Sequence, residues 1–371
     1  MRILLAGRFA GVPDQGGATW AVLQYALGFE RLGHEVLLVE PAPAAPEVVA
    51  CFEVATGGAH LAGRAALLHG GRRTTGMAWS EVAAFAAGAD VLINLAGVLT
   101  DEELLDAVSL RVFVDLDPAF TQLWHAVEGI DMGLASHHRF VTVGQAVGTA
   151  GCAVPTCGVA WIPTLPPVVL EAWPVAAGRP HYGLTTVGNW RSYGSITHGG
   201  VQYGQKAHSM RALLDLPSAL GTGVVCEPAL ALDAGEGADL GALARHGWRR
   251  QDPAAVAGDP SRYRSFVQAS TAELGVAKAG YVVSRCGWFS DRSACYLASG
   301  RPVVAQDTGW PEFLPAGEGL LAFSDTAGAA AAAGEVLDGY ERHRKAARAV
   351  AEEYLDSGPV LSHLLDAVGA T

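Results

Sequence analysis

The sequence predicts an α/β protein made of two doubly wound, Rossmann-like domains that face each other across a cleft. Strand, helix and strand patterns alternate from the first residues onward, which is typical of parallel sheets covered by helices. A proline-rich segment at 161–183 interrupts the alternation, which then resumes. The 371 residues are also more than one hydrophobic core usually holds. We therefore place an N-terminal domain at 1–172, a hinge at 173–182 and a C-terminal domain at 183–355, with a last helix at 356–371 that can pack back on the first domain.

The first half begins with a βαβ unit. The run RILLAG predicts a buried strand, and apolar residues then recur at helical spacing up to the capping residue Gly33. A second strand follows at once, which implies a parallel sheet. Further along, Thr100 with Glu103 three residues later forms a capping box. The predicted strands lie at 2–7, 34–41, 91–94, 110–115 and 139–144, and the predicted helices at 18–33, 81–88 and 101–108.

The second half is a further α/β series, without a sequence repeat of the first. A helix that begins at Ser290 has a good N-cap there, and Asp291 suits its first turn. The predicted strands lie at 182–188, 223–232, 279–285, 302–305 and 319–323, and the predicted helices at 205–217, 238–247, 259–274, 290–300, 326–355 and 358–368.

Composition and charge exclude several classes of protein. Hydrophobic residues make up 50% of the chain, as in globular rather than disordered proteins. The net charge of −12 argues against a nucleic-acid partner, because little positive charge can neutralise phosphates. The six cysteines form no C-x-x-C pair, so we expect reduced, mostly buried thiols. The first residues lack the pattern of a secretion signal, and no window approaches the roughly 20 apolar residues of a membrane span. We therefore expect a cytoplasmic protein with no integral membrane segment.

Polar residues directly after strands are candidate site residues, because ligands of open parallel sheets bind beyond the carboxyl ends of the strands. The loop after the first strand contains Asp14, Gly16 and Gly17. Adjacent glycines before a helix let an anion approach the helix N-terminus, although a flexible turn would also use them. Their spacing does not match the G-x-G-x-x-G fingerprint, which argues against a nicotinamide cofactor.

Other strand ends of the first half carry groups that could act in catalysis. Asp115 and Asp117 form an Asp-x-Asp that could bind a divalent metal, but Asp117 also suits the cap of a helix beginning with Pro118. His137, ahead of the next strand, is either a base or a structural histidine. If the reaction needs a base, the candidates are Asp14, Asp117 and His137, in that order.

Cations follow the strands of the second half. Arg191 comes just after a strand and Lys206 begins the next helix, so the two could grip a diphosphate or form a solvated surface pair. Arg292 lies in the first turn of a helix, where a cation is unfavourable unless an anion is nearby. The other candidate ligands in this turn are Ser290, Asp291 and Ser293.

The strand at 302–305 ends in a polar stretch. This stretch could hold the hydroxyl groups of a sugar, or it could be an ordinary Asx turn. The candidate ligands in it are Asp307, Thr308, Gly309 and Glu312.

Three stretches together resemble one known family. The glycine pair before a helix and the run LGHEVLLV are similar to the family's opening, and Arg191 and Lys206 match its diphosphate-binding pair. The stretch WFSDRSACYLASGRPVVAQDTGWPEFL resembles its signature, with Glu312 at the final glutamate. The family is the large family-4-like group of GT-B-fold glycosyltransferases. Where that group has one glutamate for the donor sugar and one for the ribose, this sequence has Gly287 and Cys295, which indicates a divergent bacterial branch.

The resemblance implies a metal-independent glycosyltransferase that needs no cofactor. It would move a hexose from a nucleoside-diphosphate sugar, with a UDP-sugar favoured, to a hydroxyl of a small-molecule acceptor such as a natural product or nucleoside-like metabolite. Arg191, Lys206 and Arg292, with the backbone amides of the turn at 290–293, would stabilise the leaving diphosphate. A sugar-nucleotide epimerase of the same fold and a non-catalytic nucleotide-sugar-binding protein are the alternatives. Whether the chain forms a homodimer, and whether transfer retains or inverts the anomeric centre, stays open.

Overall fold

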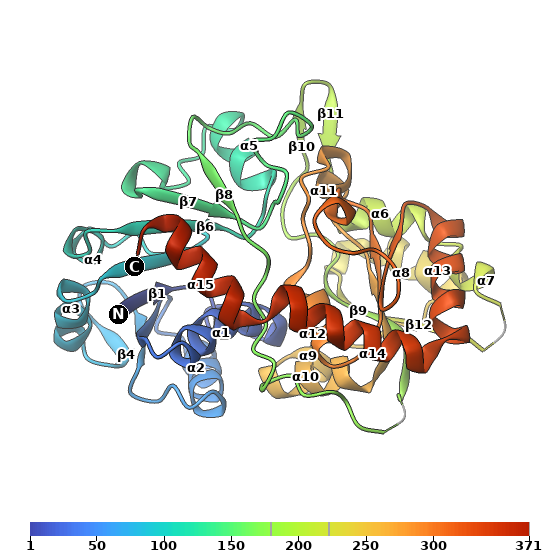
Figure 1. The fold of residues 1–371 in the computed structure, drawn as a ribbon, viewed down its shortest axis with the longest axis horizontal. Helices are drawn as coiled ribbons and strands as arrows, with labels where there is room; N and C mark the ends of the chain where they lie inside the picture. Colours follow the sequence, from blue (N-terminus) through green and yellow to red (C-terminus); the bar gives the residue numbers. More distant parts are fainter. Residues whose placement is uncertain (179, 222, 371) are drawn as a thin grey trace.

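Two parallel sheets form the framework of the molecule (Figure 1). The computed structural model describes residues 1–178, 180–221 and 223–370. In this part of the chain, the first sheet has eight strands in the order β4-β3-β2-β1-β5-β6-β7-β8, and the second has five in the order β12-β9-β13-β14-β15. Only β3 and β4 pair antiparallel among the described strands of these two sheets. The prediction of two doubly wound α/β domains is confirmed.

The N-terminal domain is built around β1, which pairs with β2 on one side and β5 on the other. Ile3 of β1 lies opposite Val36 and Val91, and all three side chains are buried. Strands buried on both faces in this way consist of continuous apolar runs. The strands are β1 (Arg2–Ala6), β2 (Glu35–Pro41), β3 (Ala65–Leu68), β4 (Thr74–Gly76), β5 (Val91–Leu95), β6 (Arg111–Asp115), β7 (Arg139–Thr142) and β8 (Trp161–Pro163). The helices are α1 (Gly16–Arg31), α2 (Pro46–Gly58), α3 (Trp79–Ala87), α4 (Glu102–Ala107) and α5 (Phe120–Ala126).

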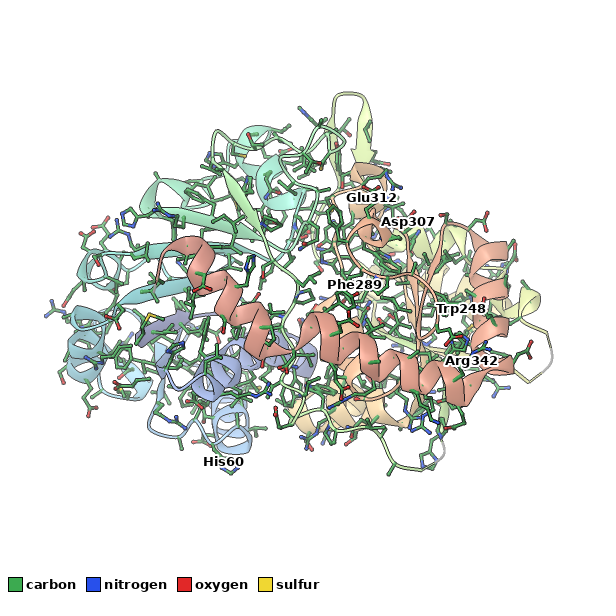
Figure 2. The ribbon with its side chains drawn as sticks, viewed as in Figure 1. His60, Trp248, Phe289, Asp307, Glu312 and Arg342 are labelled. Carbon is green, nitrogen blue, oxygen red and sulfur yellow. The ribbon has the colours of Figure 1, made fainter. Side chains whose placement is uncertain are left out.

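The C-terminal domain has its own core, in which Trp248 lies buried against the second sheet (Figure 2). Its strands are β9 (Tyr182–Asn189), the hairpin β10 (Ile196–His198) and β11 (Val201–Tyr203), β12 (Cys226–Ala231), β13 (Ser270–Gly275), β14 (Val303–Gln306) and β15 (Leu320–Phe323). Its helices are α6 (Lys206–Ala212), α7 (Leu216–Ala219), α8 (Gly237–Arg245), α9 (Pro253–Ala257), α10 (Pro260–Ala269), α11 (Ala279–Ser284), α12 (Asp291–Ala298), α13 (Thr326–Asp338) and α14 (Tyr340–Val350), and α15 (Ser357–Val368) closes the chain. None of the described helices combines the length and apolar composition needed to span a bilayer.

Two element predictions in this domain are wrong. The predicted helix at 259–274 ends at Ala269, and the residues after it form β13, whereas the predicted strand at 279–285 is α11. Glu273 accounts for the first error, because a charged residue between Ala272 and Leu274 breaks the apolar run expected of a central strand. In the structure Glu273 is nevertheless fully buried and has an ionic partner.

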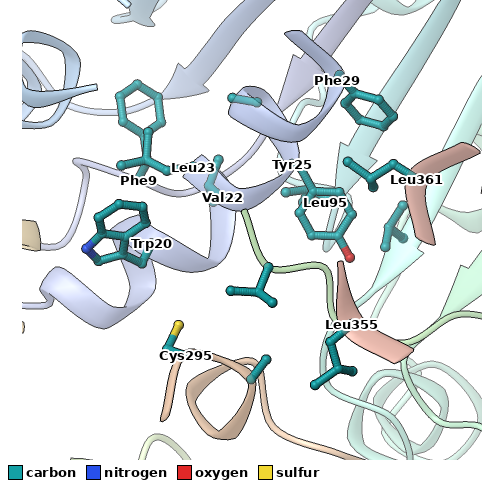
Figure 3. Packing of buried hydrophobic residues seen from close by; sticks show 14 of the residues in the cluster. Phe9, Trp20, Val22, Leu23, Tyr25, Phe29, Leu95, Cys295, Leu355 and Leu361 are labelled. Carbon is teal, nitrogen blue, oxygen red and sulfur yellow. The ribbon is translucent and has the colours of Figure 1, made fainter. Parts of the chain in front are cut away.

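A hydrophobic cluster joins the two domains (Figure 3). Trp20 and Tyr25 of α1 belong to it together with Cys295 of α12, and Leu361 of α15 closes it from the other side. A Cβ atom on Gly28 of α1 would lie 2.4 Å from Leu361, so α15 packs directly on α1. The chain therefore crosses between the domains twice, once through the segment between β8 and β9 and once on the way to α15 (Figure 1).

Candidate functional site

A cavity of about 390 Å³ lies between the domains, at the carboxyl end of β9 and the N-terminus of α12. Its volume is within the range of small-molecule sites, roughly 300–1,000 Å³. The loop between β1 and α1 forms the wall on the side of the first domain. The lining residues are Pro13, Asp14, Gln15, Gly17, Ala18, Val187, Gly188, Asn189, Ala231, Pro253, Ala254, Ala257, Tyr263, Asp291 and Arg292.

Two of the predicted cations meet at Gly188 in the floor of this cavity. A Cβ atom on Gly188 would lie 3.3 Å from Lys206 Nζ and 4.0 Å from Arg292 Nη1. A larger residue would press on the Lys206 amine, so glycine leaves room for it; Arg292 and Gly188 line the cavity, and Lys206 lies directly behind Gly188. The structure therefore brings Lys206 and Arg292 together although 86 positions separate them in the chain.

Arg292 is fixed in place by a buried ion pair. Its Nε lies 2.5 Å from Oε1 of Glu273, and its Nη1 donates to the carbonyl oxygen of Val187 at 3.0 Å. Its Nη2 is buried without a partner among the described residues, and so is Oε2 of Glu273. Burial by itself would lower the pKa of Arg292. The Glu273 carboxylate more than offsets this effect and raises the pKa above its ordinary value, so the guanidinium stays charged.

Lys206 has no such partner. The residue is 7% exposed, and no described atom forms a hydrogen bond or ion pair with its Nζ. Loss of hydration lowers the pKa of Lys206 well below its ordinary value, and the charge of Arg292 lowers it further, while the carboxylates of Glu273 and Asp291 only partly oppose the fall. An amine in this state gains from an anion, because the anion supplies the missing counter-charge. The floor of the cavity is thus prepared for a negatively charged group.

The N-terminus of α12 borders the same cavity. Ser290 caps the helix, since its side chain accepts a hydrogen bond from the Arg292 amide at 3.2 Å. Asp291 lies in the first turn, and burial raises the pKa of its carboxyl. Ser293 is 1% exposed and packs inside the domain. Of these residues, Asp291 and Arg292 line the cavity, whereas Ser290 and Ser293 support the helix.

The first-domain wall contains Asp14 and Gly17, but Gly16 has a packing role. A Cβ atom on Gly16 would lie 2.2 Å from the Asp259 carbonyl oxygen, and one on Gly17 would lie 2.9 Å from the Tyr263 ring. The glycine pair therefore lets α1 approach the second domain closely. Asp14 is exposed and has a left-handed backbone, with φ of 60°.

Glu40, at the end of β2, shapes this loop. Its carboxylate accepts hydrogen bonds from the backbone amides of Phe9, Ala10 and Gly11 at 2.7–2.9 Å. Burial raises the pKa of Glu40, while the three amides oppose the rise. Sequence reasoning missed Glu40 because an acidic residue at the end of a strand has no specific pattern.

Arg191 does not join Lys206 and Arg292, contrary to the expectation of a diphosphate-binding pair. Its Nε lies 2.6 Å from Oε1 of Glu236, and it lines none of the described cavities. The ion pair leaves 31% of the arginine side chain exposed. Arg191 therefore forms a partly exposed ion pair, but its partner is Glu236 and not the buried Lys206.

Asp117 lies in a contact between the domains. Nζ of Lys278 lies 2.9 and 2.8 Å from its two carboxylate oxygens, and the hydroxyl groups of Tyr193 and Tyr281 donate to it as well. Lys278 also lies over the rings of both tyrosines. The carboxylate is thus saturated with donors, which argues against the expected role as a catalytic base.

Asp115 and His137 are held by the fold in a similar way. Asp115 is fully buried and accepts hydrogen bonds from Thr121, Gln122 and Thr142, and burial raises its pKa. His137 contacts the Gly133 carbonyl oxygen and the Asn94 side chain with its two ring nitrogens at 2.8 and 3.1 Å, and burial lowers its pKa. In the described part of the chain, no three acidic, histidine or cysteine side chains lie close enough together to hold a metal ion.

The stretch after β14 forms a local turn. The Gly309 amide donates to the Asp307 side chain at 2.7 Å, and Thr308 donates to the Trp288 carbonyl oxygen at 2.5 Å. Arg285 binds both Asp307 and Glu312, which lie on the same side of the domain (Figure 2). These four candidate ligands do not line the described cavities, so the Asx-turn alternative describes them better.

Replacing Asp117 by asparagine is expected to lower the free energy of unfolding by about 1–3 kcal/mol, because Lys278 would keep its charge without a counter-ion. Urea unfolding followed by tryptophan fluorescence measures the change. Asp106→Asn, at an exposed position of α4, is the matched control and should change little. Equal stability of the two variants would show that the contact between the domains contributes nothing.

The two Rossmann-like domains and the cleft between them define the GT-B fold. No protein-family model and no curated protein matches the sequence. Among solved structures, an alpha-glucosyltransferase in complex with UDP and a 13-mer DNA is similar over 100% of this chain and 99% of its own, with TM-score 0.65 and 12% identity. HepE of Anabaena in complex with UDP and glucose is similar over 100% of both chains, with TM-score 0.61 and 14% identity. At these identities the similarity establishes the GT-B fold.

Proposed function

We propose that the protein is a glycosyltransferase that moves a hexose from a UDP-sugar to a hydroxyl group of a small-molecule acceptor. The observation that carries the proposal is the pair of cations at Gly188, where no side chain in the described part of the chain forms an ion pair with Lys206. The similar structures support it, because they were solved with UDP, with UDP and glucose or with UDP-glucose. A diphosphate is the group that two such cations and a helix N-terminus bind together.

In this proposal the second domain stabilises the leaving group. Negative charge develops on the diphosphate as the bond to the sugar breaks, and Lys206 and Arg292 are already in place to neutralise it. Preorganised charges of this kind lower reaction barriers by several kcal/mol. Glu273 and the carbonyl group of Val187 hold the Arg292 guanidinium in its orientation. The two side-chain cations provide the charge that a metal provides in other transferases, so we propose metal-independent transfer.

The first domain would present the acceptor. Of the three predicted bases, Asp14 alone lines the cavity. If transfer inverts the anomeric centre, Asp14 would take the proton of the acceptor hydroxyl. If transfer retains it, the leaving diphosphate can accept that proton instead. DNA is a poorer acceptor than a small molecule for this chain, because its net charge is −12.

A thermal-shift series with UDP, UDP-glucose and NAD tests the nucleotide assignment. UDP and UDP-glucose should raise the melting temperature, because a ligand of the folded state stabilises it, whereas NAD should not. Release of UDP should continue in EDTA. An equal shift with NAD would overturn the proposal. Binding without any turnover would favour the non-catalytic alternative, and a new nucleotide sugar formed from the donor alone would favour the epimerase.

UDP binding is expected to take up protons at alkaline pH. Because the pKa of Lys206 is lowered, part of the UDP-free protein carries a neutral amine at alkaline pH. A bound diphosphate would raise this pKa again, so the amine would take up a proton when UDP binds. Affinity for UDP should therefore fall as the pH rises. Calorimetric titration in two buffers with different ionisation enthalpies measures the uptake. Identical heats in both buffers, or uptake that persists in Lys206→Met, would contradict this assignment.

A further inference from the structure

A small pocket of about 70 Å³ lies beside the cavity of the cleft, between α1 and the N-terminus of α12. Asp291 lines both spaces. One face of α1 does so as well, because Gly17 lines the cavity, and Ala21 and Tyr25, at intervals of four residues, line the pocket. Side chains at this spacing lie on the same side of a helix. The pocket is therefore the next space along α1 after the cavity, and Asp291 lies at the border between them.

Two polar groups at this border lack partners. No side chain in the described part of the chain forms an ion pair with Asp291, and Arg292 beside it is paired with Glu273. The Tyr25 hydroxyl group is buried without a hydrogen-bond partner among the described residues. Burial raises the pKa of Tyr25, and the charge of the nearby Asp291 carboxylate raises it further. Because unpaired buried polar groups cost free energy, both groups would gain from a ligand that supplies hydrogen bonds.

The remaining walls of the pocket are mostly apolar. The segments after β6, β7 and β8 supply Leu116, Val143, Pro166 and Pro167. A pocket of this volume is far smaller than a whole small-molecule site, which measures roughly 300–1,000 Å³, but it exceeds the about 10–15 Å³ that one water molecule needs. It therefore suits a group of a few heavy atoms, with carbon against the apolar walls and a hydroxyl group beside Asp291.

The chemistry of the proposed donor places such a group here. In a nucleoside-diphosphate sugar, the hexose is bonded to the second phosphate, so it lies within a few atoms of the cations that hold the diphosphate. Arg292 is one of these cations in the proposed function, and Asp291 directly precedes it in the first turn of α12. A carboxylate repels a diphosphate, so UDP alone gives no reason for Asp291. A hydroxyl group of the attached sugar gives one, because it can donate to the carboxylate.

We infer that the pocket binds the hydroxymethyl group of the transferred hexose. The hydroxyl of this group donates to Asp291 and accepts from Tyr25, which uses both kinds of hydrogen bond that a hydroxyl can form. Its carbon atom contacts the apolar walls. The inference rests on the proposed function and deepens it, because it names the residues that select a hexose over a pentose in the donor.

UDP-xylose tests the inference, because it is UDP-glucose without the hydroxymethyl group. In calorimetric titrations the wild type should bind UDP-glucose roughly tenfold or more tightly than UDP-xylose, since a buried methylene contributes about fourfold and a hydrogen bond to a charged group contributes more. Asp291→Asn should reduce this preference by about threefold or more, because hydrogen bonds to neutral groups are roughly half as strong. UDP and UDP-xylose should bind Asp291→Asn as tightly as the wild type or more tightly, because a negative charge beside the diphosphate is removed.

Two further variants change the pocket without removing the carboxylate. Ala21→Leu fills the pocket from α1, so it should weaken UDP-glucose but not UDP-xylose. Tyr25→Phe removes only a hydroxyl group and should reduce the preference for UDP-glucose while UDP binding stays unchanged. Ala84→Leu, at an exposed position of α3, is the control and should bind all three nucleotides as the wild type does.

The outcomes separate this inference from the proposed function. Equal affinities of the wild type for UDP-glucose and UDP-xylose, with UDP binding intact, would overturn the inference. An unchanged preference in Asp291→Asn and Ala21→Leu would overturn it too, and so would a loss in Asp291→Asn that is the same for UDP, UDP-xylose and UDP-glucose. Equal binding of UDP-glucose and UDP-6-deoxyglucose would show that no hydroxyl group is recognised. Failure of the wild type to bind UDP would count against the proposed function instead.

Discussion

Replacing Lys206 by methionine is expected to weaken UDP binding by roughly 10- to 100-fold, equivalent to about 1.5–3 kcal/mol for a hydrogen bond to a charged group. The same change should leave the unliganded protein as stable as the wild type or more stable. The amine is buried and forms no ion pair with a described residue, and the cost of its lost hydration exceeds the attraction of Glu273 and Asp291, so its removal should not destabilise the folded protein. Calorimetric titration with UDP and thermal unfolding without ligand measure the two effects.

The stability gain in Lys206→Met should depend on pH in a definite direction. The folded protein has a lowered pKa at Lys206, so the unfolded chain binds more protons between that value and the ordinary one. The charged amine therefore reduces the free energy of unfolding of the wild type by its full amount at pH values below the lowered pKa. This reduction disappears as the pH rises to the ordinary pKa of lysine. Lys345→Met, at an exposed position of α14, is the control and should change neither affinity nor stability. Loss of stability together with affinity in Lys206→Met would point to a structural lysine.

Glu273→Gln is expected to lower the free energy of unfolding by about 3–5 kcal/mol, because Arg292 would remain as a buried charge without its counter-ion. The side chain of Glu273 is 0% exposed and that of Arg292 is 11% exposed. Urea unfolding measures the change. The comparison is Glu318→Gln, which removes an ion pair with Arg342 whose side chains are more than half exposed and should cost no more than about 1 kcal/mol.

The double variant Glu273→Gln, Arg292→Met separates stability from binding. It removes both members of the buried pair, so much of the stability lost in Glu273→Gln should return. UDP binding should not return with it, because the guanidinium is absent. A double variant that binds UDP as well as the wild type does would show that Arg292 only supports the fold.

The alternation of strands and helices predicted the architecture, because parallel sheets require it whatever the detailed contacts are. Lys206 and Arg292 could be selected for a local reason. Arg292 lies in the first turn of a helix, where a cation is unfavourable without an anion, and Lys206 begins the helix that follows a strand end. Nothing in the sequence showed that both side chains would reach Gly188.

The remaining site predictions depended on contacts between distant parts of the chain. Asp117 looked like a free carboxylate because Lys278, with which it pairs, comes 161 residues later and from the other domain. Arg191 looked available for the same reason, since Glu236 lies on a later segment. Glu273 was missed for a different reason. Its charge interrupts the apolar run of a buried strand, so the sequence around it resembled a helix. Partners of this kind become visible only when the fold has placed them.

The hydrophobic cluster that Trp20 and Tyr25 share with α12 and α15 limits how this protein can be recombined. Exchanging one half of this protein for the corresponding half of another would require a cut between the two domains. Here the cut would pass through packed side chains, because Gly16 leaves no room for a different neighbour at Asp259. A chimera would have to take α1, α10, α12 and α15 from the same parent protein, so that their packing is preserved.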